Sequence, residues 1–249
     1  MSRPLFLVAS VLVALAIVVS AISLLDAGAR ASERRVVTYE AARTLRVESA
    51  AGAVRVVGAD VERIEVRMRL TRGLSAPSVR PALRGGTLVL EDDCPAVVLG
   101  SCRVDYEIRV PRDAAVAVDS GAGDVEASGL SAGVELESSA GEVRASRIGG
   151  RLVRLSSSAG DVSAEELTAA SVDATSSAGD VEVDVARVPE RVLAESSAGD
   201  VRVLLPEAAY AVDAETSAGD EDVTVRQDPD ARAGVRVRSS AGDVVVAPR

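Results

Sequence analysis

Acidic side chains recur at one position of a repeated motif, and they are the residues of this sequence best suited to chemistry. The hexapeptide SSAGDV stands at 157–162, 176–181, 196–201 and 239–244, with looser copies around it. The acidic residues that follow the motif glycine are Asp124, Glu142, Asp161, Asp180, Asp200, Asp220 and Asp243. Carboxylates stacked about 5 Å apart would repel one another unless salt screens them, arginine neutralises them, or a cation such as Ca²⁺ binds between them.

Turn capping competes with calcium binding as the role of these carboxylates. An aspartate beside a glycine can accept hydrogen bonds from the amides of a tight corner, and serine hydroxyls can do so more weakly. Calcium-binding β-rolls use a glycine-rich nonapeptide, and this sequence lacks its period and its density of glycines. We therefore predict capped turns, no resident metal and no cofactor. The weak calcium candidates are Asp161, Asp180, Asp200 and Asp220.

Conventional catalytic side chains are scarce in this chain. It contains no His and no Trp, its 28 basic residues are all Arg, and its aromatic residues are three Tyr and one Phe. Serine and cysteine triads in their usual forms are therefore excluded, and aromatic platforms for sugars are almost lacking. Paired carboxylates could serve a polysaccharide-acting β-helix enzyme, which we keep as the least favoured function. We predict no catalytic residues and no enzymatic activity.

The spacing of the motif glycines indicates a repeating β architecture. These glycines are Gly123, Gly141, Gly160, Gly179, Gly199, Gly219 and Gly242. They are 18, 19, 19, 20, 20 and 23 residues apart, which is too short for a crossover helix in each repeat. Glycine supplies the positive φ of a tight corner, and the flanking segments alternate with the period of two typical of strands. The sequence therefore predicts an all-β, single-chain parallel β-solenoid, β-helix-like, with coils of about 19 residues, each lying on the previous one.

Apolar residues at two points of each coil are expected to fill the interior of this solenoid. The first point begins an inward-facing column, formed by Val125, Val143, Val162, Val181, Val201 and Val244. The second point, at the opposite corner, comprises Leu130, Ile148, Leu167 and Val188. Because one coil cannot bury its apolar face alone, the terminal coils need caps.

The N-terminal segment is expected to tether the protein to a membrane. Residues 5–25 carry no charge and, as a helix, are long enough to cross a bilayer. Small-residue cleavage sites at 27–31 leave a cleaved secretion signal as the alternative, but the length of the apolar stretch favours an uncleaved anchor. The expected divisions are a tail (1–4), a transmembrane anchor (5–25), a linker (26–35), an irregular first β part (36–118) and the repeat solenoid (119–249). We expect a single-pass protein of the cell membrane with its C-terminal domain extracytoplasmic.

The first β part contains the longest candidate strands. Alternating residues at 61–70, 87–92 and 102–110 indicate strands. The stretch 71–86 between them has two prolines and three glycines, so we expect a loop there. Its arginines could contact membrane phosphates or an acidic partner, and a solvated loop is the simpler alternative.

Two cysteines, Cys94 and Cys102, lie at the end of this part. They could close a loop with a disulfide in an oxidising compartment, or remain buried thiols. Their spacing and the lack of His exclude a CxxC redox or zinc site.

Charge is unevenly distributed along the chain. Residues 1–118 carry 16 Arg and 13 acidic residues, whereas residues 119–249 carry 12 Arg and 25 acidic residues, and the formal net charge is −10. Such an acidic half repels nucleic acid, so we expect no nucleic-acid partner.

Several motifs resemble those of a known family of bacterial envelope proteins. VRVVG, TLVLED, YEIRVP and AVAVDSGAGDVEASG, followed by the repeated GDV, resemble the "putative adhesin" or toast-rack domains, a family of unknown function. The resemblance covers about residues 36–249. It implies an all-β solenoid on the cell surface, often encoded with envelope-stress systems, and no catalytic residues. The family pattern does not explain Cys94 and Cys102.

A binding role fits these observations best, because a regular rod presents long flat faces and needs no pocket. We expect a membrane-anchored, extracytoplasmic, non-catalytic binding or adhesin-like module of the cell envelope. Its expected partners are the membrane, through the N-terminal helix, and an envelope protein or cell-wall glycan. The alternative is a sensory or regulatory component of an envelope-stress response system.

Overall fold

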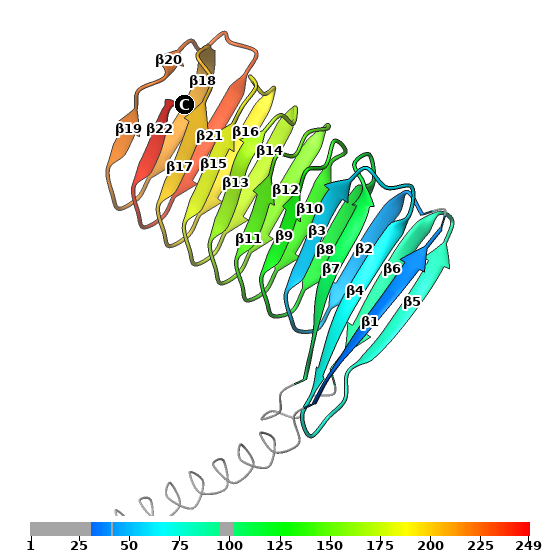
Figure 1. Ribbon diagram of the computed structural model, residues 1–249. Helices are drawn as coiled ribbons and strands as arrows, with labels where there is room; N and C mark the ends of the chain where they lie inside the picture. Colours follow the sequence, from blue (N-terminus) through cyan, green and yellow to red (C-terminus); the bar gives the residue numbers. More distant parts are fainter. Residues whose placement is uncertain (1–30, 41, 95–101) are drawn as a thin grey trace, which may run out of the picture.

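The described part of the chain is a flattened rod made of two facing β-sheets (Figure 1). The computed structural model describes residues 31–40, 42–94 and 102–249. These residues form two 11-stranded sheets, and eleven strands at about 4.8 Å each extend roughly 50 Å. The predicted transmembrane helix at 5–25 lies outside the described residues. Within them, no helix has the length and apolar character needed to cross a membrane.

We call the two layers sheet A and sheet B. Sheet A contains, in spatial order, β1 (Ala31–Tyr39), β4 (Ile64–Arg72), β7 (Arg103–Pro111), β3 (Val54–Ala59), β9 (Val125–Ser128), β11 (Val143–Ser146), β13 (Val162–Leu167), β15 (Val181–Val185), β17 (Val201–Leu205), β22 (Val244–Pro248) and β19 (Glu221–Val223). Sheet B contains, from the same end, β5 (Ser78–Arg84), β6 (Thr87–Asp93), β2 (Thr44–Ser49), β8 (Ala115–Ser120), β10 (Val134–Ser138), β12 (Leu152–Ser157), β14 (Ser171–Ser176), β16 (Arg191–Ser196), β21 (Gly234–Ser239), β18 (Ala209–Thr216) and β20 (Arg226–Gln227).

Each regular coil contributes one strand to each sheet. In one such coil, β12 lies in sheet B, the SSAGDV corner follows it, and β13 lies in sheet A. Neighbouring strands are parallel and in register, so that Val162 lies opposite Val143 of the preceding coil and Val181 of the next. The described residues are therefore all-β as predicted, and the predicted stacking of parallel strands is confirmed for the regular coils.

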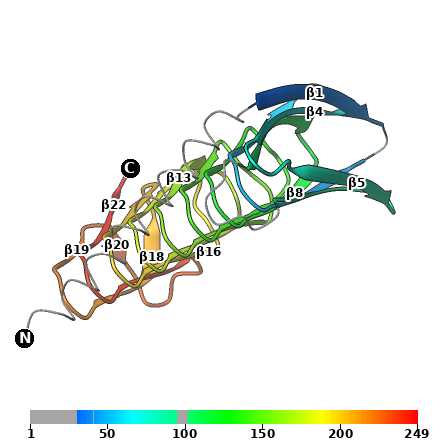
Figure 2. The same cartoon turned by 90° about the horizontal axis from the view of Figure 1, so that it is seen from below.

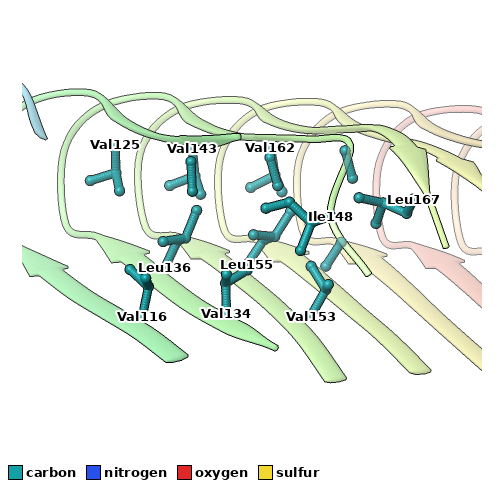
Figure 3. Close-up of a cluster of buried hydrophobic side chains, with 14 of the residues drawn as sticks. Val116, Val125, Val134, Leu136, Val143, Ile148, Val153, Leu155, Val162 and Leu167 are labelled. Atoms are coloured by element: carbon teal, nitrogen blue, oxygen red, sulfur yellow. The ribbon is translucent and has the colours of Figure 1, made fainter. Parts of the chain in front are cut away.

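Valine, leucine and alanine fill the space between the two sheets. Figure 3 shows Val125, Val143 and Val162 of sheet A pointing toward Leu136 and Leu155 of sheet B. The predicted inward column from Val125 to Val244 is at most 1% exposed. Burying one such side chain contributes about 1.5–3 kcal/mol, so the column is a principal source of stability.

The second apolar point of the coils was predicted correctly for three residues out of four. Leu130, Ile148 and Leu167 are buried, but Val188 is 45% exposed. Val185 takes its place, because it lies opposite Leu167 and is fully buried. The repeat from Gly179 to Gly199 has 20 residues, against 19 in the repeat before it, and Val188 lies in the connection between β15 and β16.

The coils do not follow sequence order at either end of the rod. The β2–β3 coil lies between the β6–β7 coil and the β8–β9 coil. At the other end, the β21–β22 coil lies between the β16–β17 coil and the β18–β19 coil. The prediction that each coil of residues 119–249 lies on the previous one is therefore wrong for the last two coils.

A polar side chain explains the order at the C-terminal end. Glu221 of β19 lies opposite Val244 of β22, at the position that other coils fill with the inward valine. A carboxylate between two coils would be buried without a charged partner, which costs several kcal/mol. On the last coil it stays exposed and accepts a hydrogen bond from the Thr216 amide at 3.0 Å. The coil that carries Glu221 must therefore be terminal.

Antiparallel strands form the opposite end of the rod (Figure 2). Strand β4 pairs antiparallel with β1 and β7, and β5 pairs antiparallel with β6. Two predicted boundaries are wrong here, because β1 begins at Ala31 inside the expected linker and β5 occupies half of the expected loop. Pro81 is tolerated in β5 because an edge strand has one side that needs no N–H donor.

Candidate functional site

The aspartates of the motif form a column that joins one coil to the next. The Oδ1 atom of Asp161 accepts a hydrogen bond from the backbone N–H of Asp180 at 2.9 Å. The other pairs of the column, acceptor first, are Asp124 and Glu142 at 3.0 Å, Asp180 and Asp200 at 2.8 Å, Asp200 and Asp243 at 2.8 Å, and Asp243 and Asp220 at 2.9 Å. These carboxylates therefore cap corners between coils, whereas the sequence suggested capping within one corner.

The four calcium candidates all lie in this column. Asp161, Asp180 and Asp200 each use a carboxylate oxygen to accept a backbone amide of the next coil. Asp220 lies at the exposed end of the column, beyond Asp243. In the described ranges, no three Cys, His, Asp or Glu side chains gather as metal ligands. The geometry favours capping as the role of these side chains.

The first serine of the motif forms a second column, which the sequence reasoning missed. Ser157 is 2% exposed, and its Oγ donates to the carbonyl oxygen of Gly141 in the neighbouring coil at 2.9 Å. The same bond, donor first, joins Ser138 and Gly123, Ser176 and Gly160, Ser196 and Gly179, Ser239 and Gly199, and Thr216 and Gly242. The signal was present in the sequence, because each of these hydroxyl residues stands three positions before the motif glycine of its own coil.

The motif glycines form the corners themselves. Their φ angles lie between +135° and +152° in all seven coils. A Cβ on any of them would lie 2.2–2.4 Å from the carbonyl oxygen of the neighbouring glycine. Serine, glycine and aspartate of the motif are thus all used in stacking one coil on another.

A disulfide-closed loop replaces the motif in the β6–β7 coil. Cys94 and Cys102 are joined by a disulfide with a Cα–Cα distance of 5.7 Å. Val104 occupies the place of the motif glycine, because a Cβ added to Gly52 of the next coil would lie 2.2 Å from the Val104 carbonyl oxygen. The disulfide therefore joins the two strands of a coil whose corner is longer than the others.

A polar cluster lies buried beneath this corner. Asp92, Ser49 and Tyr106 are 6%, 5% and 1% exposed. Asp92 stands where other coils have the motif serine, because the residue before it, Glu91, lies opposite Glu48. Its Oδ1 accepts the Ala50 amide at 3.0 Å, and the Ser49 and Tyr106 hydroxyls lie beside the carboxylate. The sequence signal for this cluster was an aspartate, Asp92, at the position where other coils have the motif serine.

Burial raises the pKa of Asp92, while the Ala50 amide and the nearby Ser49 and Tyr106 hydroxyls act to lower it. Burial and the Asp92 carboxylate raise the pKa of Tyr106 as well. A raised pKa means that the folded state binds the Asp92 proton more tightly than the unfolded state does. The stability from this proton is present below the ordinary aspartate pKa of about 4 and is lost as the pH rises through the raised value.

We expect the substitution Asp92→Asn to raise the melting temperature by a few degrees at pH 7, because it removes a buried charge and keeps an acceptor for the Ala50 amide. The difference from the unmodified protein should shrink as the pH is lowered to 4. Thermal melts from pH 4 to pH 8 measure it, with Asp119→Asn on the exposed outer face as the control. A gain that is independent of pH would show that the charge of Asp92 is not its cause.

The outer face of sheet A carries compensated charges. Glu107, Arg55, Glu126 and Arg144 alternate in sign on the adjacent strands β7, β3, β9 and β11. The closest pair joins Arg55 Nη2 to Glu126 Oε2 at 2.7 Å. Cross-strand neighbours of opposite charge stabilise the sheet and leave little net charge on this part of the face.

The outer face of sheet B carries an acidic row, formed by Glu91, Glu48, Asp119 and Glu137 on the adjacent strands β6, β2, β8 and β10. Glu91 is paired with Arg80 at 2.8 Å and Glu48 with Arg46 at 3.7 Å. Asp119 and Glu137 have no ion-pair partner among the described residues. Like charges about 4.8 Å apart are destabilising, so this row is a candidate binding surface for cationic groups.

The comparisons with known proteins concern both sequence and fold. The model of the family described as Toastrack DUF4097 matches residues 112–247. No curated protein sequence matches the chain.

Solved structures similar to this chain include two from other bacteria. A protein of Clostridium sporogenes described as a "putative cell adhesion protein" is 12% identical, with 88% of this chain and 100% of that chain covered and a TM-score of 0.46. A "putative adhesin" of Bacteroides fragilis is 13% identical, with 88% and 97% covered and a TM-score of 0.48.

Proposed function

Since the chain belongs to the Toastrack DUF4097 family, we propose that it is a non-catalytic binding module of the cell envelope. In this proposal, residues 5–25 hold it in the cell membrane and the rod lies outside the cytoplasm. The membrane and an envelope protein or cell-wall glycan are its partners.

The observation that carries this proposal is the use of the repeated polar residues. Among the described residues, the motif serines and aspartates recur through the regular coils, and most of their side chains bond the backbone of a neighbouring coil. Asp92 and Tyr106, whose pKa values are raised by burial, lie in the core, where no substrate could meet them. What the rod offers to another molecule is its two long outer faces.

The acidic row is the part of those faces that suits a partner best. Asp119 and Glu137 are exposed, lie on adjacent strands of a rigid sheet, and lack a neutralising arginine. A rigid row of charges loses little entropy on binding. Amino groups of a cell-wall glycan or a basic patch of an envelope protein would complement it.

We expect Asp119→Arg with Glu137→Arg to reduce binding of the full-length, detergent-solubilised protein to its partner at least tenfold. The control is Glu165→Arg with Glu182→Arg, which makes the same charge change on the outer face of sheet A. Binding is measured by co-sedimentation with purified cell wall and by cross-linking in membranes. An equal loss in both variants would make the effect one of net charge and would contradict the acidic row as the binding surface.

The same measurements separate adhesion from regulation. Sedimentation with cell wall supports the adhesin-like role. A specific cross-link to one membrane protein, together with a changed envelope-stress response in a deletion strain, would favour the sensory or regulatory alternative. If both variants bind as the unmodified protein does, and deletion changes neither attachment nor stress response, the proposal is wrong.

A further inference from the structure

The antiparallel end of the rod exposes apolar side chains. We call this end the tip and define it as strands β1, β4 and β5 with the connection 73–77. Among the described residues, the exposed large hydrophobic side chains are Val36 at 67%, Leu74 at 49%, Leu83 at 54% and Val188 at 45%. The first three belong to the tip. Leu83 lies opposite the fully buried Leu88, so it is on the core side of sheet B and is exposed because no coil stacks above it.

Arginines surround these apolar side chains. The three strands of the tip carry Glu33 and Glu65 as their only acidic residues. Their arginines are Arg34, Arg35, Arg67, Arg69, Arg72, Arg80 and Arg84. Arg67, Arg69 and Arg84 have no ion-pair partner among the described residues. The first two lie on the outer face of sheet A, opposite Glu107 and Asp105 of β7 but without an ion pair to them, and the third lies on sheet B. Arginines thus rim the apolar tip on both sides.

The sequence restricts what this tip can meet. The apolar segment 5–25 ends six residues before Ala31, the first residue of β1. Six residues span at most about 20 Å when fully extended. If that segment crosses the membrane, as the proposed function holds, the tip lies within this distance of the lipid surface.

We propose that the tip is a membrane-contact surface that binds the headgroups of anionic phospholipids. Its apolar side chains enter the interface, and its arginines contact the phosphates, as in other basic surfaces with apolar residues at their centre. The acidic coils, with 12 Arg against 25 acidic residues over 119–249, are repelled from the same surface. The rod is thereby held upright, with its distal acidic coils away from the membrane.

A second copy of the chain suits the tip less well. Two tips in contact would place their arginine rims against each other, and like charges across an interface are unfavourable. The lipid surface supplies the opposite charge and the apolar environment together.

Hydrogen exchange of the full-length protein in lipid nanodiscs tests this proposal. We expect the amides of β1 and β5 to exchange at least threefold more slowly in discs containing phosphatidylglycerol than in discs of phosphatidylcholine alone. Salt at 0.5 M should remove the difference, because it shortens the Debye length to about 4 Å and so screens the headgroup charge. Arg67→Glu with Arg69→Glu and Arg84→Glu should abolish it.

The matched control makes the same charge change far from the tip, with Arg187→Glu, Arg202→Glu and Arg232→Glu, which are exposed in the distal coils. Unchanged circular dichroism and melting temperature ensure that both variants fold. The proposal is overturned if exchange is the same in both lipids, if the control loses protection equally, or if protection requires several copies per disc. Failure of the protein to enter discs would instead overturn the membrane tether of the proposed function.

Discussion

The substitution Gly160→Ala is expected to lower the free energy of unfolding by about 2–5 kcal/mol, the sum of an unfavourable backbone conformation and overpacking. Gly160 has φ of +148°, and a Cβ at this position would lie 2.2 Å from the Gly141 carbonyl oxygen. That oxygen already accepts the Ser157 hydroxyl, so the neighbouring coil cannot shift without losing this bond. Urea denaturation measures the effect.

Gly234→Ala is the control for this substitution. Gly234 opens β21, and a Cβ there would meet no heavy atom within 4 Å. We expect its effect to stay within about 0.5 kcal/mol, as for other unstrained surface positions. If the two substitutions destabilise the protein equally, contact between the glycine corners does not determine how the coils stack.

The second large effect concerns the order of the last two coils. Val235 of β21 and Val212 of β18 lie opposite each other in register, and Val235 is 2% exposed whereas Val212 is half-buried. Val235→Asp should destabilise the protein by about 4 kcal/mol or more, because it buries an unpaired carboxylate between two coils. Val212→Asp, on the terminal coil, should cost about 1 kcal/mol, because its carboxylate remains in contact with water.

Thermal and urea unfolding of the two variants distinguish the two orders of stacking. If the coils followed the sequence, residues 234–248 would form the exposed end and the two effects would be reversed. A larger effect of Val212→Asp would therefore contradict the arrangement of β21 and β22 inside the rod.

The repeat made the regular part of the fold predictable. Corners with one glycine at a fixed spacing, flanked by alternating residues, allow few arrangements other than stacked parallel strands, and the column from Val125 to Val244 is buried as expected. Val188 was misplaced because the coil with the longer period has two candidate apolar positions, Val185 and Val188, and spacing alone favoured the wrong one.

The order of the coils was harder to predict, because every motif copy can stack on every other. One residue carried the information, namely Glu221 at the position of the inward valine. Glu221 indicates a terminal coil only if it is known that the same position is buried in the neighbouring coils. A search for polar residues at column positions would have identified the terminal coil.

The first part of the rod was predicted least well, because its strands are antiparallel and its corner is not a motif. Edge strands such as β5 need not alternate regularly, since one of their sides is exposed, and two prolines made 71–86 look like a loop. The cluster of Asp92, Ser49 and Tyr106 brings together strands β6, β2 and β7, and β2 is distant in sequence from the other two. Such a cluster becomes visible only once the register of the strands is known.

The position of β21 and β22 has a consequence for the synthesis of the rod. A solenoid stacked in sequence order can fold coil by coil during synthesis, because the coil on which each new coil stacks has already formed. Here the β18–β19 coil emerges before the coil on which it must rest. Until residues 234–248 have been synthesised, the β18–β19 coil must stay unpaired or pair temporarily with the β16–β17 coil. The last two coils therefore reach their final order in a late step, and the C-terminal end of the rod exposes unpaired strand edges until that step is complete.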